Sequence, residues 1–460
     1  MAGKVTQRKG AASCSRDGGR TGRVQVESRP GVAAGAERGV RGIGRSWGAR
    51  LLRRALPVCF LFASFSPCGA EEQAYHTTLA GEPGRVTFMG QIVEIPAVNR
   101  ADMTSITLGA SFLSPARGQG PIIPVAAFYH RRITDRSYGR AMVAIFVNEL
   151  EYDRDLGGWD LVAQFENGTL PVAERELRDG EEIRGSSLNY GTLLGSLGVG
   201  WRLPVAPFQV DNDLRVQLVA LGGYFYAHRE TDSAPGLWVP PNTGLYGARL
   251  RCRYDGMRRN LLELPHEGMA AGFDVDYLHR DRWRAEAGSA DDGNRNYAQA
   301  EGHLVGAIGV PGLSERNRLL LGLYGGFTAQ GRGDRFNAFR LNGGPFPGEQ
   351  YDLAWPHYSG VIYDRVLARG YATATAGYRR ELAFFLYLST LGSYIWADRS
   401  SAVGDDRVDF KQMHGSAATV ALDSAFPWKS SLYLAWSWES GVLRNGRSGN
   451  GVTLIWNKLF

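Results

Sequence analysis

Short segments of alternating apolar and polar residues recur along most of this chain. In residues 432–438 every second side chain is large and apolar, and the side chains between them are small or polar. Because a β-strand turns successive side chains to opposite faces, this pattern predicts a strand with one apolar face. Residues 269–278 alternate in the same way, but Asp274 and Asp276 share one face there. Two carboxylates on one strand face require water or polar partners behind them.

Sixteen such segments can be marked between residue 84 and the C-terminus. They lie near 84–95, 103–113, 121–132, 139–150, 157–166, 190–203, 213–228, 243–254, 268–280, 295–309, 318–330, 371–382, 384–397, 414–426, 430–440 and 451–460. Most are close to the ~9–11 residues that a tilted membrane-spanning strand needs. They predict an all-β fold, a transmembrane antiparallel β-barrel of about sixteen strands over residues 102–460. Residues 71–101 form an N-terminal segment with a possible first strand, and a soluble β-sandwich or propeller is the competing fold.

The last ten residues favour the barrel. Val452, Leu454, Trp456 and Phe460 lie on one face of an alternating segment that ends on an aromatic residue, although Lys458 interrupts that face. This pattern resembles the C-terminal signal by which bacterial outer-membrane proteins are recognised for assembly. It predicts a location in the bacterial outer membrane, with lipid as the surroundings of the barrel.

The N-terminal region predicts a secretory leader. Basic residues at 50–54 precede an apolar run at 56–65, which is too short to span a bilayer core of roughly 30 Å as a helix. Residues 50–70 are therefore expected to be a signal peptide cleaved after small residues, with a lipid-modified Cys68 as the less favoured alternative. Residues 1–49 have no periodicity, and we expect them to be disordered or to follow from a start codon assigned too early.

Composition and charge support the same class of protein. The chain contains 60 Gly, 20 Tyr, 20 Phe and 11 Trp, and its mean hydropathy of -0.24 is too polar for a helical membrane protein. Residues 1–54 hold 13 Lys/Arg and 3 Asp/Glu, whereas the rest of the chain holds 39 and 43. The positive charge therefore belongs to the leader, and a nucleic-acid partner is not expected. Only Cys252 follows the leader, so no disulfide framework is predicted.

Three features of residues 243–460 carry a family resemblance. The first is a turn with an acidic and basic cluster before a proline and a glycine, namely Asp255, Arg259, Asn260, Pro265 and Gly268. The second is the stretch 339–344, and the third is Arg369-Gly370-Tyr371 after a long Gly-rich connection. This ordered set resembles the BamA/TamA-type assembly barrels, also called the bacterial surface antigen family. In that family an R-G-F/Y motif lies in the long sixth loop, with five strands after it, as predicted here.

The resemblance implies a position for Arg369. The family's motif loop folds back into the lumen, where its arginine bonds acidic groups of the inner wall. A guanidinium in a confined lumen needs such a charged partner to offset its desolvation. The family's acidic D-x-G position is occupied here by Thr390 in residues 390–392, so Glu381, Asp274 and Asp276 are the candidate partners.

The resemblance also implies a function in the insertion or transport of polypeptides at the outer membrane, with unfolded outer-membrane or secreted polypeptides as partners. About thirty residues separate Glu71 from the secure strands, so no POTRA domain of the family fits there. The alternative is a passive outer-membrane pore for small solutes, whose selectivity is determined by charged lumen residues such as Arg215.

Motifs of catalysis and metal binding are missing from the sequence after the predicted leader. Residues 71–460 contain no GxSxG, no HExxH, no P-loop and no pair of CxxC motifs. Residues 290–294 are better explained as a hairpin turn than as a calcium loop. A rim enzyme that pairs Asp405 or Asp406 with His414 is a minor alternative. We therefore expect no enzymatic activity, no metal and no cofactor.

Overall fold

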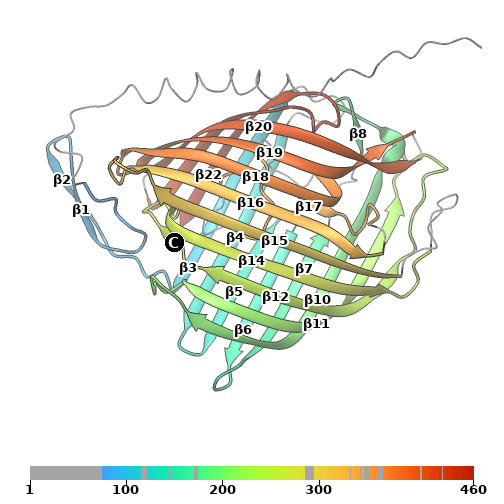
Figure 1. Cartoon of the computed structure of the whole chain (residues 1–460), viewed down its shortest axis with the longest axis horizontal. Coiled ribbons are helices and arrows are strands. Elements are labelled where there is room, and N and C mark those ends of the chain that lie inside the picture. The colour runs from blue at the N-terminus through green and yellow to red at the C-terminus, as the bar shows by residue number, and fades with distance from the viewer. Residues whose placement is uncertain are drawn as a thin grey trace, which may run out of the picture. The chain divides into compact units, whose positions relative to one another are not determined.

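Sixteen strands in the described part of the chain close into one antiparallel barrel (Figure 1). The computed structural model describes residues 75–114, 122–145, 147–169, 175–284, 295–331, 333–341, 343–346, 353–359, 366–404, 407–426 and 428–460. The barrel strands are β3 (Asp102–Ser114), β4 (Ile122–Thr134), β5 (Ser137–Ala144), β6 (Val147–Asp155), β7 (Asp160–Thr169), β10 (Leu188–Pro204), β11 (Asp213–Arg229), β12 (Thr243–Asp255), β14 (Pro265–Arg280), β15 (Asn296–Gly309), β16 (Asn317–Gln330), β18 (Val366–Ala383), β19 (Leu386–Ala402), β20 (Val408–Phe426), β21 (Ser430–Glu439) and β22 (Gly449–Leu459). The predicted fold class is confirmed. The predicted signal peptide lies outside the described residues.

Several short elements accompany the ring. They are β1 (Gly84–Phe88), β2 (Gln91–Ile95), β8 (Leu177–Arg178), β9 (Glu181–Glu182), η2 (Arg184–Ser186), β13 (Arg258–Arg259) and β17 (Phe339–Leu341). Strands β13 and β17 extend the barrel ladders, whereas β1–β2 and β8–β9 are separate hairpins. Over the described ranges no helix is long and apolar enough to cross a membrane.

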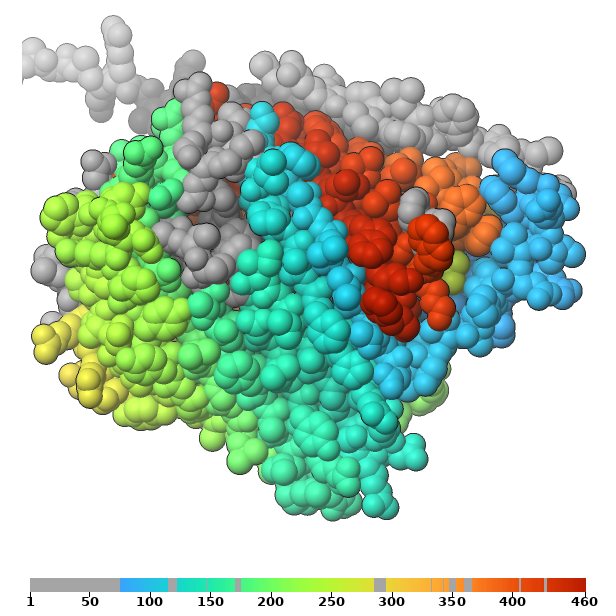
Figure 2. Space-filling model, turned by 180° about the vertical axis from the view of Figure 1, so that it is seen from behind, coloured from blue at the N-terminus to red at the C-terminus, as the bar shows by residue number. Residues whose placement is uncertain are grey.

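Each barrel strand pairs with the next one along the chain, and the ring closes between β22 and β3. In Figure 2 the strands near the two ends of the chain, coloured cyan and red, lie side by side. The strands alternate in direction, so the connections gather at two ends. We call the end where β3 begins and β22 stops the turn end, because its connections are short. The opposite end is the loop end, and it holds the long connection between β16 and β18.

The outer face of the wall is apolar. Along β10, for example, Leu193, Leu197, Val199 and Trp201 are exposed, while the residues between them face the interior. Exposed aromatic side chains lie in two zones. Towards the loop end they include Tyr224, Tyr246, Tyr277, Phe327 and Tyr394, and towards the turn end Trp159, Trp201, Phe208, Trp428 and Phe460. A continuous apolar band between aromatic zones is unfavourable in water and suits a bilayer.

The inner wall has two different halves. Strands β4–β7, β10–β12, β14 and β15 carry many arginines and carboxylates inside, whereas β18–β22 and β3 carry mainly serine, threonine and alanine, with a few charged residues such as Arg379 and Glu439. An apolar cluster packs against the second half, and its members come from the wall and from the β16–β18 connection. The interior is therefore a packed and ion-paired core, with little resemblance to a wide water-filled channel.

Two of the predicted segments were wrong in a way that left the total unchanged. Residues 84–95, the possible first strand, form the separate β1–β2 hairpin, with Met89 and Gly90 in the turn at positive φ. Residues 139–150 cover parts of two strands, β5 and β6, which pair with each other. One strand too many at the start thus offset one strand too few later.

Candidate functional site

The candidate site is the lumen, and its first closure is the β16–β18 connection. Trp355 Nε1 donates to Glu149 Oε1 on β6 at 3.3 Å. A few residues later, Thr373 Oγ1 on β18 donates to the His357 carbonyl at 3.3 Å, and the Ser359 hydroxyl lies 2.9 Å from that of Ser393 on β19. Counted round the ring from β3, β6 is the fourth strand and β18 the twelfth, so they form opposite walls. The segment 353–359 therefore crosses the lumen.

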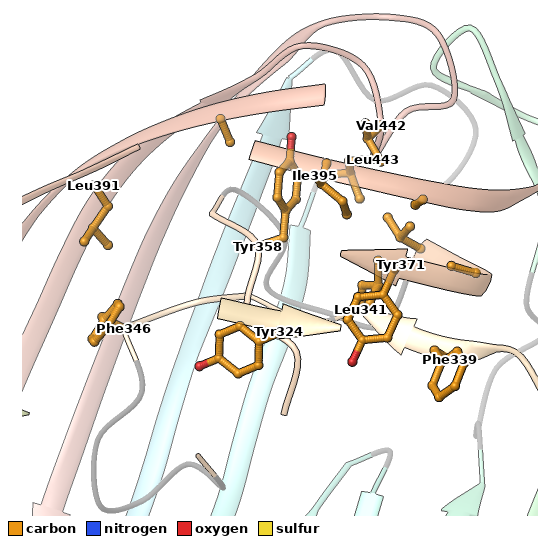
Figure 3. Packing of buried hydrophobic residues seen from close by; sticks show 14 of the residues in the cluster. Tyr324, Phe339, Leu341, Phe346, Tyr358, Tyr371, Leu391, Ile395, Val442 and Leu443 are labelled. Carbon is orange, nitrogen blue, oxygen red and sulfur yellow. The ribbon is translucent and has the colours of Figure 1, made fainter. Parts of the chain in front are cut away.

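The crossing segment is packed as well as bonded. Phe346 and Tyr358 are almost completely buried, among wall residues such as Leu391 and Ile395 (Figure 3). Burial lowers the pKa of His357 to about 4, because the charged imidazolium would lose its hydration. His357 is thus neutral at neutral pH and adds no charge to the apolar cluster.

The charged half of the wall is neutralised internally. Arg249, Arg251 and Arg253 follow one another on the inner face of β12. Arg249 binds Asp276 at 2.7 and 2.8 Å, and Arg253 binds Asp274 at 2.6 and 2.8 Å. Cross-strand pairs of this kind satisfy buried charges that would otherwise be costly. A polar cavity remains between this wall and Leu353 of the crossing segment, lined also by Arg131, Arg140, Arg215 and Arg253.

A second feature of the site lies at the turn end, where residues 75–101 run along the turns of the barrel. The Arg100 guanidinium binds both oxygens of Asp211 at 2.6 and 2.7 Å and also reaches Glu263 at 2.7 Å. Arg259 binds the same Asp211 at 2.8 Å and Asp255 at 2.7 Å. All of these side chains except Asp255 and Glu263 are less than a tenth exposed. The N-terminal segment is thus tied to the barrel by a buried ion network.

Asp211 is the central carboxylate of this network. Burial alone would raise its pKa, but the guanidinium groups of Arg259 and Arg100 outweigh that effect and hold the pKa at about 2. Elsewhere in the same segment, Thr77 Oγ1 donates to Glu381 at 2.7 Å and Tyr75 also bonds Glu381. These contacts extend the attachment of the segment towards β18.

The predicted family-like turn is brought together by the fold. Asp255 and Arg259 form the ion pair just described. Asn260 Oδ1 accepts from the backbone N–H groups of residues 262 and 264, both at 3.0 Å, and shapes the turn. The Pro265 carbonyl accepts from Arg379 at 2.8 Å, and Gly268 lies at φ +102° at the bulge where β13 meets β14.

We expect Gly268→Ala to lower the free energy of unfolding by more than about 1 kcal/mol, because alanine is strained at positive φ and its Cβ would collide with the Gly256 carbonyl oxygen. The matched variant Gly222→Ala, where no atom lies within 4 Å of the new Cβ, should stay within about 1 kcal/mol of the wild type. Chemical denaturation followed by tryptophan fluorescence measures both. Equal stabilities of the two variants would contradict the explanation.

The predicted partners of Arg369 are wrong. Glu381 bonds Tyr75 and Thr77 at the turn end, and Asp274 and Asp276 bond the arginines of β12. The guanidinium of Arg369 instead binds Asp398 of β19, with Nη2 at 2.7 Å and Nε at 2.9 Å. The physical reason is distance along the wall, because Arg369 lies at the loop end and Glu381 at the other end of the same strand.

The position of Arg369 follows from a β-bulge. Ala368 pairs with Arg399 and Tyr371 with Ala397, so Arg369 and Gly370 together stand opposite Asp398. Asp398 alternates with the buried Ala397 and Arg399 and shares the outward face of β19 with Trp396. Arg369 therefore lies on the outer face, outside the lumen that the resemblance implied.

The other two residues of the motif are placed differently. Tyr371 is buried inside, with its ring 5.3 Å from that of Phe339. Gly370 lies against the outward-facing Trp396. A Cβ added to Gly370 would lie 3.9 Å from the nearest ring carbon of Trp396. The loop before the motif does enter the lumen. There Trp355, His357 and Tyr358 make the contacts with the inner wall, whereas the resemblance implied that the arginine makes them. Asp398 was missed because the predicted strand stopped at residue 397, one residue short.

The predicted C-terminal signal residues lie on the outer face of β22. Val452, Leu454 and Phe460 are exposed and Trp456 is half-buried. Strand β22 pairs with β3 from Asn450↔Ser114 to Leu459↔Ser105, a ladder of ten pairs that equals the β21–β22 ladder beside it. The seam between β22 and β3 therefore has as many residue pairs as the β21–β22 ladder, and its register is continuous.

The histidine considered for catalysis lies apart from the lumen. His414 is on the outward side of β20, where its Nδ1 lies 2.7 Å from the Tyr394 hydroxyl. Asp405 and Asp406 lie outside the described residues, as do residues 290–294 of the calcium-loop alternative. The described residues contain no group of three or more His, Cys, Asp or Glu that could hold a metal ion.

Comparisons with known proteins give similar barrels. No family model matches the chain, and no curated protein matches it. Among solved structures, BamA from Haemophilus ducreyi lacking POTRA domains 1-3 is 12% identical, with 89% of this chain and 79% of that chain covered and a TM-score of 0.47. CdiB from Acinetobacter baumannii is 8% identical over 83% and 66% of the two chains, with a TM-score of 0.45. OprD from Pseudomonas aeruginosa is 9% identical over 78% and 94%, with a TM-score of 0.33. Similarities this low assign neither a family nor a function.

Proposed function

We propose that this protein is an outer-membrane barrel that assists the insertion or transport of polypeptides and rests with its lumen closed. The observation that carries the proposal is the segment before Arg369-Gly370-Tyr371, which crosses the lumen between opposite walls. A long loop folded into the lumen ahead of this motif is what the resemblance to BamA/TamA-type barrels implied. The apolar outer wall with two aromatic zones supports the membrane location.

The rival function is a passive pore for small solutes. The charged inner wall with its polar cavity favours it, because such walls select ions and polar solutes. Two features speak against free diffusion. The crossing segment 353–359 blocks the lumen, and residues 75–101 are tied under the turn end by Arg100. A solute path would need at least one of these segments to move.

Lateral opening for insertion has one natural place in this ring. Strands β3 and β22 are neighbours that no connecting turn joins, whereas every other pair of adjacent strands is continuous in the chain. Separation there exposes two strand edges, to which an extended polypeptide can add. The ladder of ten pairs makes the closed form the resting state, so opening must be coupled to client binding.

A cross-link across the seam tests this proposal. Ser111 of β3 and Thr453 of β22 bond each other through their hydroxyl groups inside the barrel. We expect liposomes with the wild-type protein to accelerate the folding of a small client barrel several-fold. We expect oxidised Ser111→Cys/Thr453→Cys to lose this acceleration and to regain it on reduction, because a covalent bond prevents the two strands from separating.

The control cross-link is placed between strands that need not separate. Thr419 of β20 and Ser437 of β21 are a register pair whose side chains are both buried inside the barrel, so Thr419→Cys/Ser437→Cys is matched in chemistry. It should retain the acceleration when oxidised. If the folded wild-type protein does not accelerate client folding, the insertion proposal fails and the pore takes its place. If the seam cross-link leaves the acceleration intact, the seam is not the route.

A further inference from the structure

A hollow of about 470 Å³ is open on the outer wall, across β15, β16, β18 and β19. It follows from two rows of paired residues. The row nearer the loop end consists of Gly302, Gly325, Ala372 and Trp396, and the next row of Leu304, Leu323, Ala374 and Tyr394. Small residues thus form the floor and large apolar residues the sides. The place is recessed because its small residues lie between large side chains on β15, β16 and β19.

Arg369 lies one step beyond this hollow towards the loop end. Its partner Asp398 is two residues after Trp396 on the same face of β19, and its guanidinium carbon lies 4.5 Å above the ring of Phe410. The ion pair with Asp398 and the ring of Phe410 together hold the guanidinium in one orientation. Nε and Nη2 both donate to a single oxygen of Asp398, and among the described residues Nη1 has no hydrogen-bond acceptor. The side chain is 32% exposed.

This order of groups matches the order along a membrane lipid. An acyl chain is apolar and narrow, and it fits a recess with a Gly and Ala floor. Tryptophan and tyrosine, here Trp396 and Tyr394, are the residues that favour the level where chains meet headgroups. An arginine just above that level meets the headgroup phosphate, to which guanidinium donors bind strongly. The hollow, the pair Trp396 and Tyr394, and Arg369 therefore follow one another in the same order as the acyl chain, the interfacial region and the phosphate of a lipid.

We propose that this surface binds one anionic membrane lipid, with an acyl chain in the hollow and a phosphate at Arg369. The proposal rests on the membrane location given above and is independent of client insertion. The phosphate adds to the Arg369–Asp398 pair through the Nη1 side, so Asp398 orients the guanidinium and the lipid completes its hydrogen bonds. Arg369 of the family-like motif would then act outside the lumen, in lipid binding.

Native mass spectrometry of the purified barrel in detergent tests the proposal. The protein is titrated with phosphatidylglycerol or with an uncharged diacylglycerol that has the same chains. We expect tighter binding of phosphatidylglycerol by the wild type. Ala374→Phe fills the hollow and should weaken binding of both lipids by about tenfold, the equivalent of ~1.4 kcal/mol. Arg369→Gln should remove the preference for phosphatidylglycerol and leave diacylglycerol binding unchanged.

The matched control is Ala220→Phe, because Ala220 is an exposed outward alanine on β11, far round the ring from the hollow. It should bind both lipids as the wild type does. Equal binding by Ala374→Phe and Ala220→Phe would show ordinary surrounding lipid only and would overturn the proposal, as would a wild type without preference between the two lipids. Because this measurement needs no client protein, its outcome is independent of the outcome of the insertion assay.

Discussion

Replacing Asp211 with asparagine should lower the free energy of unfolding of the barrel by about 3–5 kcal/mol. Asparagine has the same shape but no charge, so Arg100 and Arg259 would lose the carboxylate that neutralises them in a buried place. Glu263 and Asp255 remain as partners, but each reaches only one of the two arginines. Because residues 75–101 are held by this network, the same variant should become more sensitive to limited proteolysis in that segment.

The control for Asp211→Asn is Glu94→Gln in the same N-terminal segment. Glu94 pairs with Arg85 at 2.8 Å, but both side chains are largely exposed, and such pairs contribute about 0–1 kcal/mol. Denaturant titration in detergent, followed by tryptophan fluorescence, compares the two variants with the wild type. Similar losses from Asp211→Asn and Glu94→Gln would contradict a special contribution of the buried network.

The same network predicts an acid limit of stability. In the folded barrel the pKa of Asp211 is about 2, against a value of 3.8 for an unperturbed aspartate. The depressed pKa contributes stability that is present above about pH 4 and is lost as the pH falls through about 2. The difference corresponds to roughly 2 kcal/mol. The unfolding midpoint of the wild type should therefore fall over this range, and Asp211→Asn should flatten that fall.

Replacing residues 353–359 with a glycine and serine segment of equal length should turn a nearly silent barrel into one with sustained ion currents. With glycine at positions 355 and 359, the replacement removes the Trp355–Glu149 bond on one wall, the Ser359–Ser393 bond on the other, and the buried Tyr358 side chain between them. The same connection also contacts β10 and β11 through Phe336, but those contacts lie at the loop end. Planar bilayer recordings measure the change.

An equal treatment of an exposed connection provides the control for the recordings. The turn 156–159 between β6 and β7 lies outside the lumen at the turn end, and its replacement by glycine and serine should leave the currents at the wild-type level. If the 353–359 replacement also remains silent while the barrel is folded, the lumen is closed by its charged wall or by residues 75–101. Large currents from the wild type would favour the passive pore.

Alternation with a period of two was a reliable guide to the wall, because every barrel strand has one face inside and one outside. Alternation failed as a guide where a turn contains none of the residues that commonly form turns, such as Gly or Pro. Between β5 and β6 the chain runs through Ala144, Ile145, Phe146 and Val147, an apolar stretch without Gly or Pro, so two strands were predicted as one. The opposite error at 84–95 had a visible signal, because Met89-Gly90 forms the hairpin turn.

The sequence by itself determined that this chain forms a closed all-β ring of about sixteen strands with an apolar outside. The reason is that alternation is local and can be counted strand by strand. Only the tertiary structure decided the partners of the predicted site residues. Asp398 meets Arg369 because a bulge places two residues of β18 opposite one of β19, and Asp211 meets Arg100 across more than a hundred residues. Such pairings depend on register, bulges and the curvature of the closed ring, which no local pattern contains.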